Sequence, residues 1–142
     1  MKRNKIDFTI AEISIEEWQL HWKKIFKTNI LQSLEYGIAK ERAEGWKVYR
    51  FAIKDPSGKP VAITQCLGKS WPIIGGIARM NRGPLLLNQY NEEVATDITI
   101  KAIRLLLSAM QKKRCRVIQI APELNNTELV KERLRNIGLK YV

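Results

Sequence analysis

Hydrophobic and polar residues repeat with two different periods along the chain, and the changes between the periods predict its elements. Phe8 and Ile10 alternate with polar neighbours, which indicates a short first strand. Ser14 and Glu17 then have the spacing of a capping box, so a helix is predicted to begin there. A second helical pattern runs from about Ser33 to Glu44 and stops at a glycine.

The middle of the chain changes to the period of a strand. Residues 46–54 alternate, the stretch "DPSGKP" supplies turn residues, and residues 61–67 return as the partner of a hairpin. After a break at "SWPIIGG", residues 76–82 form a further strand. The alternation therefore favours consecutive strands in one sheet.

The last third begins with a broad apolar surface on residues 91–114, which predicts a long helix lying across a sheet. The stretch "CRVIQIAP" predicts a strand, and "NNTELVKERLRNIGL" predicts a last helix that ends at Gly138. The predicted order is βααβββαβα. It favours one α/β (α+β) domain over residues 1–142, with a mixed sheet of about five strands, flanking helices and an open edge near the C-terminus.

Composition adds a strong charge to this picture. The chain has 142 residues, of which 45% are hydrophobic, and this fraction is enough for a core and argues against global disorder. Lys and Arg number 25 against 14 Asp and Glu, a formal net charge of +11. Such a balance favours a nucleic acid, a nucleotide-linked substrate or an anionic membrane surface as partner, although a protein that is merely basic is the alternative.

Several kinds of chemistry are not expected. Cys66 and Cys115 lie far apart in apolar stretches, which indicates buried, reduced thiols and no metal site. His21 stands between Trp18 and Trp22 without a visible carboxylate partner, so packing is favoured over a general-base role. No apolar run reaches the roughly 20 residues of a membrane span, and we expect a cytoplasmic protein.

One corner of the sequence is a candidate binding site. In "GIARMNRGPLLLNQ", the residues Arg82, Gly83 and Pro84 stand where a strand stops before a helix, a junction that often holds a phosphate in α/β proteins and often only turns the chain. Arg82 could present a bidentate guanidinium to a pyrophosphate or carboxylate, or simply be solvated. Arg79 points from the opposite face of an extended strand, so the two arginines are not expected to serve one site.

A second candidate is a polar stripe formed by Gln32, Tyr36 and Lys40. These residues are spaced by four, which places them on one side of a continuous helix, where they could line a groove. The alternative is an ordinary solvated helix face.

This order of elements resembles the GNAT acyltransferase fold. The stretches "ILQSLEYGIAKERAEGW" and "ARMNRGPLL", the second before a long helix, resemble the first domain of the Fem family, the peptidoglycan bridge-forming aminoacyltransferases. The most telling matches are the Leu-Gln pair at residues 31 and 32 and the basic-Gly-Pro step at residues 82–84. The likeness covers nearly the whole chain.

The resemblance implies an N-acyltransferase that moves an amino acid from aminoacyl-tRNA to an amine of a peptidoglycan precursor carried on a nucleotide or a lipid pyrophosphate. It also implies a substrate-binding lysine late in the second helix, for which Lys40 is the nearest residue. Arg82, Tyr36 and Gln32 complete the expected substrate site, and no catalytic residue is assigned. The expected location is the cytoplasm, including the inner surface of the membrane.

Coenzyme A is not expected as a cofactor. A coenzyme-A-dependent GNAT protein usually has a glycine-rich loop before its long helix, whose free amides hold the pyrophosphate. Here "LLLNQYNEEV" has no glycine, and Glu92 and Glu93 would repel an anion. We therefore expect no bound cofactor.

The resemblance also implies closing strands and a second domain beyond Val142, so a downstream domain or a partner chain is expected. Two other functions stay open at this point. The chain could be a basic module that binds RNA or tRNA, or a non-catalytic partner of a separate transferase chain.

Overall fold

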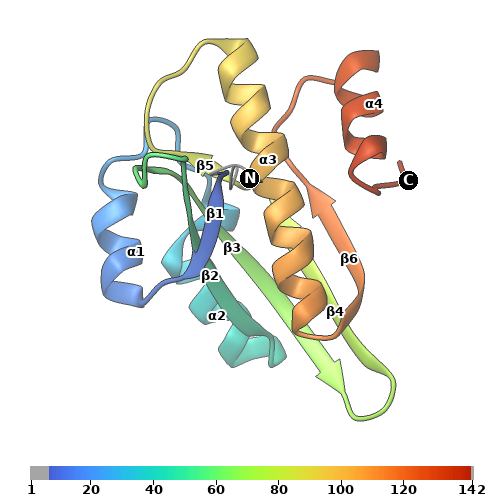
Figure 1. Ribbon diagram of the computed structural model, residues 1–142. Helices are drawn as coiled ribbons and strands as arrows, with labels where there is room; N and C mark the ends of the chain where they lie inside the picture. Colours follow the sequence, from blue (N-terminus) through green and yellow to red (C-terminus); the bar gives the residue numbers. More distant parts are fainter. Residues whose placement is uncertain (1–6, 142) are drawn as a thin grey trace, which may run out of the picture.

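Helices cover both faces of one mixed sheet in the computed structural model, which describes residues 7–141 (Figure 1). In chain order the elements are β1 (Thr9–Glu12), α1 (Ile15–Trp22), the 3₁₀ helix η1 (Ile30–Gln32), α2 (Leu34–Glu44), β2 (Lys47–Lys54), β3 (Pro60–Trp71), β4 (Gly75–Asn81), β5 (Leu85–Leu86), α3 (Glu92–Lys112), β6 (Cys115–Ala121) and α4 (Glu128–Asn136).

The strands lie in the order β1-β2-β3-β4-β6, and β5 pairs with β3 beside this path. The neighbours are antiparallel except for β4 and β6, which are parallel and are connected through α3. Within residues 7–141, β6 pairs with β4 alone and forms an open edge of the sheet. This confirms the mixed sheet and the edge near the C-terminus that the sequence predicts.

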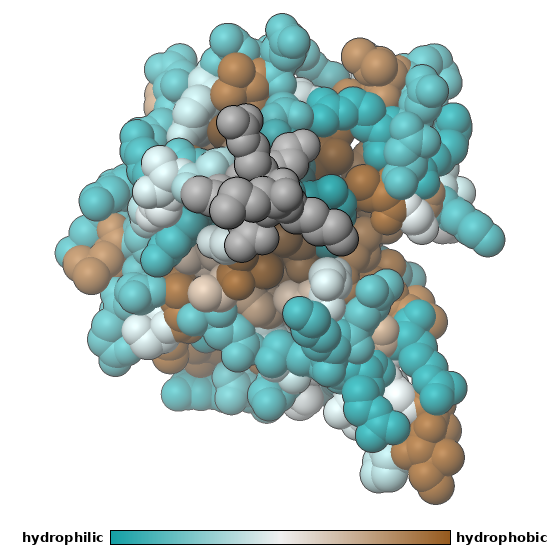
Figure 2. Space-filling model, in the orientation of Figure 1, coloured by the Kyte–Doolittle hydropathy of each residue, from teal (hydrophilic) through white to brown (hydrophobic). Residues whose placement is uncertain are grey.

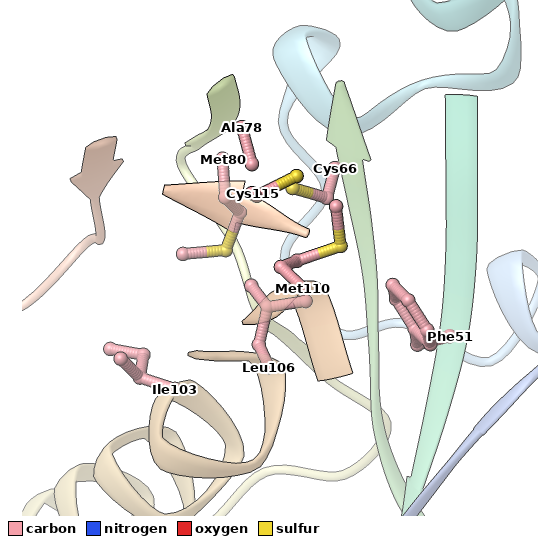
Figure 3. Close-up of a cluster of buried hydrophobic side chains, with 8 residues drawn as sticks. All are labelled: Phe51, Cys66, Ala78, Met80, Ile103, Leu106, Met110 and Cys115. Atoms are coloured by element: carbon pink, nitrogen blue, oxygen red, sulfur yellow. The ribbon is translucent and has the colours of Figure 1, made fainter. Parts of the chain in front are cut away.

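The main core lies between the sheet and α3. Strand side chains that alternate toward α3 meet the apolar stripe of this helix (Figure 3). The buried members are Phe51, Cys66, Ala78, Met80, Ile103, Leu106, Met110 and Cys115. Each Phe, Ile, Leu or Met side chain in this set contributes about 1.5–3 kcal/mol to stability when it leaves water. This gain explains why α3 lies across the sheet, as its pattern predicts.

The other face of the sheet carries α1 and α2. Trp18 of α1 is fully buried and packs with Ala52, Ile63 and Leu85. The Ser14 hydroxyl accepts a hydrogen bond from the Glu17 backbone amide, as the capping residues predict. In the space-filling view most of the surface is hydrophilic, and an apolar patch lies at the end of the β3–β4 hairpin (Figure 2).

Three features differ from the sequence-based prediction. The stretch "SWPIIGG" is not a break, because β3 continues to Trp71 and pairs directly with Gly75 at the start of β4. Two short elements, η1 and β5, were not predicted, so the order contains four consecutive strands instead of three. Both are too short for a period of either kind to be visible in the sequence.

Candidate functional site

The corner at residues 82–84 marks the place where the chain leaves the middle of the sheet. The Arg82 amide still donates a hydrogen bond of 2.7 Å to the Ala121 carbonyl, but Arg82 adopts a left-handed φ of 59° and the chain turns toward β5. Gly83 is buried beneath this turn. A Cβ on Gly83 would lie 2.7 Å from the Thr64 hydroxyl oxygen and 2.9 Å from the Gln32 side chain, so only glycine fits without displacement.

The turn opens a gap along β3. Strand β4 pairs with residues 67–71 of β3 and β5 pairs with residues 62–63, which leaves Gln65 between them. The side-chain amide of Gln32 fills this gap. Its Oε1 accepts a hydrogen bond of 2.7 Å from the Gln65 amide, and its Nε2 donates to the carbonyls of Gln65 at 3.0 Å and Asn81 at 2.7 Å.

This placement corrects the expectation for Gln32. The residue lies in η1, before the Ser33 N-cap of α2, and does not continue the stripe of Tyr36 and Lys40. Its side chain is only 1% exposed, and its amide is occupied by backbone groups. Gln32 therefore positions the corner instead of lining a groove.

A layer of buried polar side chains continues from this gap beneath α2. The Gln65 Oε1 accepts from Arg50 Nε at 3.1 Å, and the Gln65 Nε2 donates to the Ser33 carbonyl at 3.1 Å. Arg50 is 9% exposed, and its Nη2 has no hydrogen-bond partner in the described part of the chain. Burial lowers the pKa of this guanidinium.

A cluster of charged and aromatic side chains lies on the same face of the sheet, around the buried Trp46 just after α2. The Lys40 ammonium lies 2.7 Å from Glu44 Oε1 and 5.6 Å from the centre of the Tyr36 ring. The Trp46 indole donates to the other Glu44 oxygen at 2.9 Å. We call the cluster the basic platform. Its members are Tyr36, Lys40, Glu44, Trp46, Lys69 and Arg79.

The indole of Trp46 is the centre of the basic platform. Lys69 Nζ lies 4.7 Å and Arg79 Cζ 5.8 Å from the centre of this ring, distances at which a cation is attracted by the ring face. Arg79 also donates from Nη2 to Gln119 Oε1 at 3.2 Å. Three cations and one carboxylate give the platform a positive charge, which suits a phosphate or carboxylate ligand.

Two groups of the platform, Glu44 and Lys40, favour each other's charged forms. Hydrogen bonds from Lys40 and Trp46 lower the pKa of Glu44. The hydrogen bond to Glu44 raises the pKa of Lys40, and the nearby charge of Arg79 acts in the opposite direction. Lys40 is therefore a fixed positive charge and not a candidate base near neutral pH.

The structure brings Tyr36 and Lys40 together, as expected, but joins them with a different arginine. The side chain of Arg82 is exposed, and among residues 7–141 it has no ion pair or side-chain hydrogen bond. Arg79 and Lys69 were not predicted as partners of Lys40. Only the register of β3 against β4, which pairs Leu67 with Arg79, places them on the face that carries α2.

A hollow lies on the other side of the corner, at the start of α3. Its volume is about 320 Å³, and Pro84, Leu86 and Tyr90 are among its lining residues. It also contains two carboxylates, Glu92 and Glu123. Lys27 also lines the hollow, and its Nζ lies 3.9 Å from Glu123 Oε2, so two acids outnumber one lysine and give the lining a net negative charge, opposite to that of the basic platform.

The two cysteines and the single histidine lie outside the platform, and burial favours their uncharged forms. Burial raises the pKa of the Cys66 thiol to about 12 and also raises that of Cys115, so neither forms a thiolate readily. Burial lowers the pKa of the half-buried His21, which lies on α1 away from the platform. Residues 7–141 contain no group of three or more His, Cys, Asp or Glu arranged to hold a metal ion.

The same residues contain no helix that is both long and apolar enough to cross a membrane.

Comparison with known protein families and structures gives independent evidence about the family and the fold of this chain. The model of the FemAB family matches residues 13–136. The crystal structure of FemX is similar with a TM-score of 0.62 and 19% identity, and the match covers 92% of this chain and 32% of the FemX chain. This chain therefore spans about a third of the length of that relative. No curated protein sequence matches the chain.

Two further structures share the fold over nearly their whole length. A probable acetyltransferase has a TM-score of 0.59 and 8% identity, covering 94% of this chain and 90% of its own. The glucosamine-6-phosphate N-acetyltransferase from Arabidopsis thaliana has a TM-score of 0.54 and 11% identity, and the match covers 95% of this chain and 92% of that enzyme's chain. At these identities the likeness concerns the fold alone, and it confirms the GNAT-like architecture.

Proposed function

The chain belongs to the FemAB family, and from this premise we propose that it is the first domain of an aminoacyl- or acyltransferase of cell-wall synthesis. The proposed donor is aminoacyl-tRNA. The proposed acceptor is an amine of a peptidoglycan precursor that is carried on a nucleotide or a lipid pyrophosphate. The observation that supports the proposal most directly is the basic platform, where Lys69 and Arg79 lie over the Trp46 ring and Lys40 pairs with Glu44, which accepts from the same indole.

The reaction needs little covalent help from the protein. The precursor amine attacks the ester carbonyl carbon that joins the amino acid to the tRNA, and the new C–N bond forms as the ester C–O bond breaks. The ribose oxygen leaves and takes up the proton that the amine loses. An enzyme can accelerate these steps by holding the two reactants together and by neutralising phosphate charge, without a nucleophile of its own.

The residues of the proposed substrate site divide into two roles. Lys40 and Arg79 supply charge for a pyrophosphate, and Tyr36 borders the Lys40 ammonium. Arg82 supplies a further exposed cation at the corner. Gln32 acts on the site only through the gap that it closes between β3 and the corner.

Coenzyme A is not part of this proposal. A pyrophosphate at the start of α3 would meet Glu92 and Glu93 in the first turn and Glu123 across the hollow. These charges oppose the attraction that a helix N-terminus otherwise offers to an anion.

The proposal can be tested by calorimetry with a nucleotide-linked muropeptide, using the full protein with any segment that follows residue 142. We expect Arg79→Ala and Lys40→Ala each to weaken binding by about 1.5–3 kcal/mol, the loss of one charge-assisted contact. Arg104→Ala is the matched control, because Arg104 is exposed on α3, which packs against the other face of the sheet. Equal affinities in all three variants would exclude the platform as the substrate site.

Arg82 has a prediction of its own. Arg82→Ala should weaken binding of the same muropeptide by about 1.5–3 kcal/mol and leave the free energy of unfolding almost unchanged, since the side chain is exposed. Calorimetry and urea unfolding on one preparation separate the two effects. Unchanged affinity would show that the corner only turns the chain and does not bind the muropeptide.

A further inference from the structure

The β3–β4 hairpin projects from one end of the molecule (Figure 1). Exposed apolar side chains lie at its turn. The exposed fraction is 48% for Trp71, 90% for Ile73 and 70% for Ile74. The two isoleucines account for the strongly hydrophobic patch at the end of the projection in Figure 2. We call residues 71–75 the hairpin tip.

The conformation of the hairpin tip makes its composition unusual. Trp71 pairs with Gly75, and Ile73 adopts a left-handed φ of 72° in the turn between them. Glycine or asparagine would adopt this conformation at lower cost, because a β-branched side chain is strained there. The position thus holds a large apolar residue where local structure favours a small or polar one.

Basic residues surround the tip. A cavity of about 450 Å³ beside Trp71 is lined by Lys47, Lys69 and Lys113, among others. The stem of Arg116 lies about 3.1 Å from the position of a Cβ on Gly75, and the Arg114 carbonyl accepts from the Gly76 amide at 3.0 Å. We call these the basic rim, formed by Lys47, Lys69, Lys113, Arg114 and Arg116.

Few acids balance the basic rim. Lys113 pairs with Glu12 at 2.7 Å, and Glu44 lies on the platform next to Lys69. The sequence itself has no Asp or Glu between Asp55 and Glu92, the segment that contains the whole hairpin tip. It also has none between Asp97 and Glu123, the segment that supplies three of the five rim residues.

We propose that this end of the molecule docks on an anionic membrane surface, with the hairpin tip inserted among the lipids and the basic rim on the headgroup phosphates. A short apolar segment flanked by cations is the combination that binds such a surface, and tryptophan favours the boundary between lipid and water. The cavity beside Trp71 has room for a headgroup phosphate between lysines.

The apolar residues favour a membrane over other partners. Isoleucine side chains cannot stack on bases or donate hydrogen bonds, so Ile73 and Ile74 would add little to an RNA contact. Three apolar residues are also far fewer than the 20–30 residues on each side of a typical stable protein interface. Positive charge around a small apolar projection therefore matches an anionic lipid surface better than an RNA or a protein partner.

Vesicle binding tests the proposal without any tRNA or peptidoglycan precursor, so its failure would leave the proposed transferase function untouched. The protein is titrated with vesicles of phosphatidylglycerol and phosphatidylcholine, and with phosphatidylcholine alone, in a flotation assay. We expect binding to the anionic vesicles only. The double variant Ile73→Asn/Ile74→Asn should weaken it at least about tenfold, because both apolar anchors are lost.

The rim is tested in the same assay. Lys47→Gln/Arg116→Gln should weaken binding by about 25-fold, because each cation near the surface contributes about fivefold. The matched controls are Leu20→Asn and Lys23→Gln. Leu20 is 61% exposed on α1 and Lys23 follows this helix, which lies away from the hairpin in Figure 1. Both controls should bind as the unchanged protein does.

Three results would overturn the proposal. The first is no binding to anionic vesicles, and the second is equal loss in the Leu20 or Lys23 controls. The third is full vesicle binding by Ile73→Asn/Ile74→Asn, which would reduce the effect to general attraction by the net charge of +11. If the tip variants weaken binding of tRNA and leave vesicle binding unchanged, the surface belongs to a nucleic acid instead.

Discussion

At the scale of single residues, the Gln32 side chain forms hydrogen bonds with three backbone groups of the sheet. The amide of a glutamine has a donor and an acceptor side by side, as a strand backbone does, and Gln32 presents both to Gln65. A second bond from the same Nε2 reaches Asn81, where β4 ends. One side chain thus ties η1 to the two strands that separate at the corner.

Replacing Gln32 by leucine should lower the free energy of unfolding by about 3 kcal/mol. The variant leaves the Gln65 amide and two carbonyls buried without partners, and each such group costs about 1–3 kcal/mol. Urea unfolding measures the loss, with Gln111→Leu as control because Gln111 is exposed on α3. A change below about 1 kcal/mol would contradict the role assigned to this amide.

At the scale of elements, the position of α2 over the sheet depends on a glycine inside the helix. Glycine weakens a helix interior, so Gly37 has a packing reason to be there. A Cβ at this position would lie 2.5 Å from Gln65 Oε1 and 2.8 Å from Arg50 Nη2. The close approach brings Tyr36 and Lys40 of α2 beside the strand residues of the platform.

Gly37→Ala should therefore destabilise the protein by about 1–3 kcal/mol, although alanine is the better helix former. Thermal and urea unfolding can measure the change. The matched control is Ala39→Gly, on the exposed side of the same helix, which should cost about 1 kcal/mol through helix propensity alone. A Gly37→Ala variant more stable than the unchanged protein would show that α2 does not pack as closely as described.

At the scale of the whole molecule, charge and shape separate two ends of the fold. The hairpin tip and basic rim lie at one end, and the hollow with Glu92 and Glu123 lies at the other, where α3 begins. A net charge of +11 acts over the whole surface and attracts any polyanion, including the tRNA part of the proposed donor.

Binding of tRNA should consequently depend steeply on salt. If about three phosphates are neutralised, affinity should fall roughly fortyfold between about 50 and 200 mM salt, because counterions are released on binding. Fluorescence anisotropy with labelled tRNA measures this slope. Lys40→Gln/Lys69→Gln should flatten it, whereas Lys23→Gln/Lys24→Gln, just after α1, should not.

A salt-independent affinity would contradict an electrostatic tRNA contact. Tight tRNA binding with no transfer of an amino acid in the full protein would instead favour the alternative of a basic RNA-binding module.

The sequence by itself determined the four α-helices and the strands β1 to β4 and β6 with their approximate limits, but not η1 or β5. The cap at Ser14, the cap at Ser33 and the left-handed Gly45 after α2 act within one helical turn, and the structure has all three where the sequence predicts them. The apolar stripe of residues 91–114 likewise predicts that α3 crosses the sheet. Signals of this kind are local, so they can be read along a single chain.

Tertiary structure alone decided which residues meet. Arg79 joins Lys40 because Leu67 pairs with Arg79 in the β3–β4 register, and Gln32 turns inward because the sheet opens beside Gln65. The apolar stretch at residues 71–75 became a hairpin turn for the same reason, since Trp71 pairs with Gly75. Register and gaps between strands depend on packing across the whole sheet, and no short-range period in the sequence contains that information.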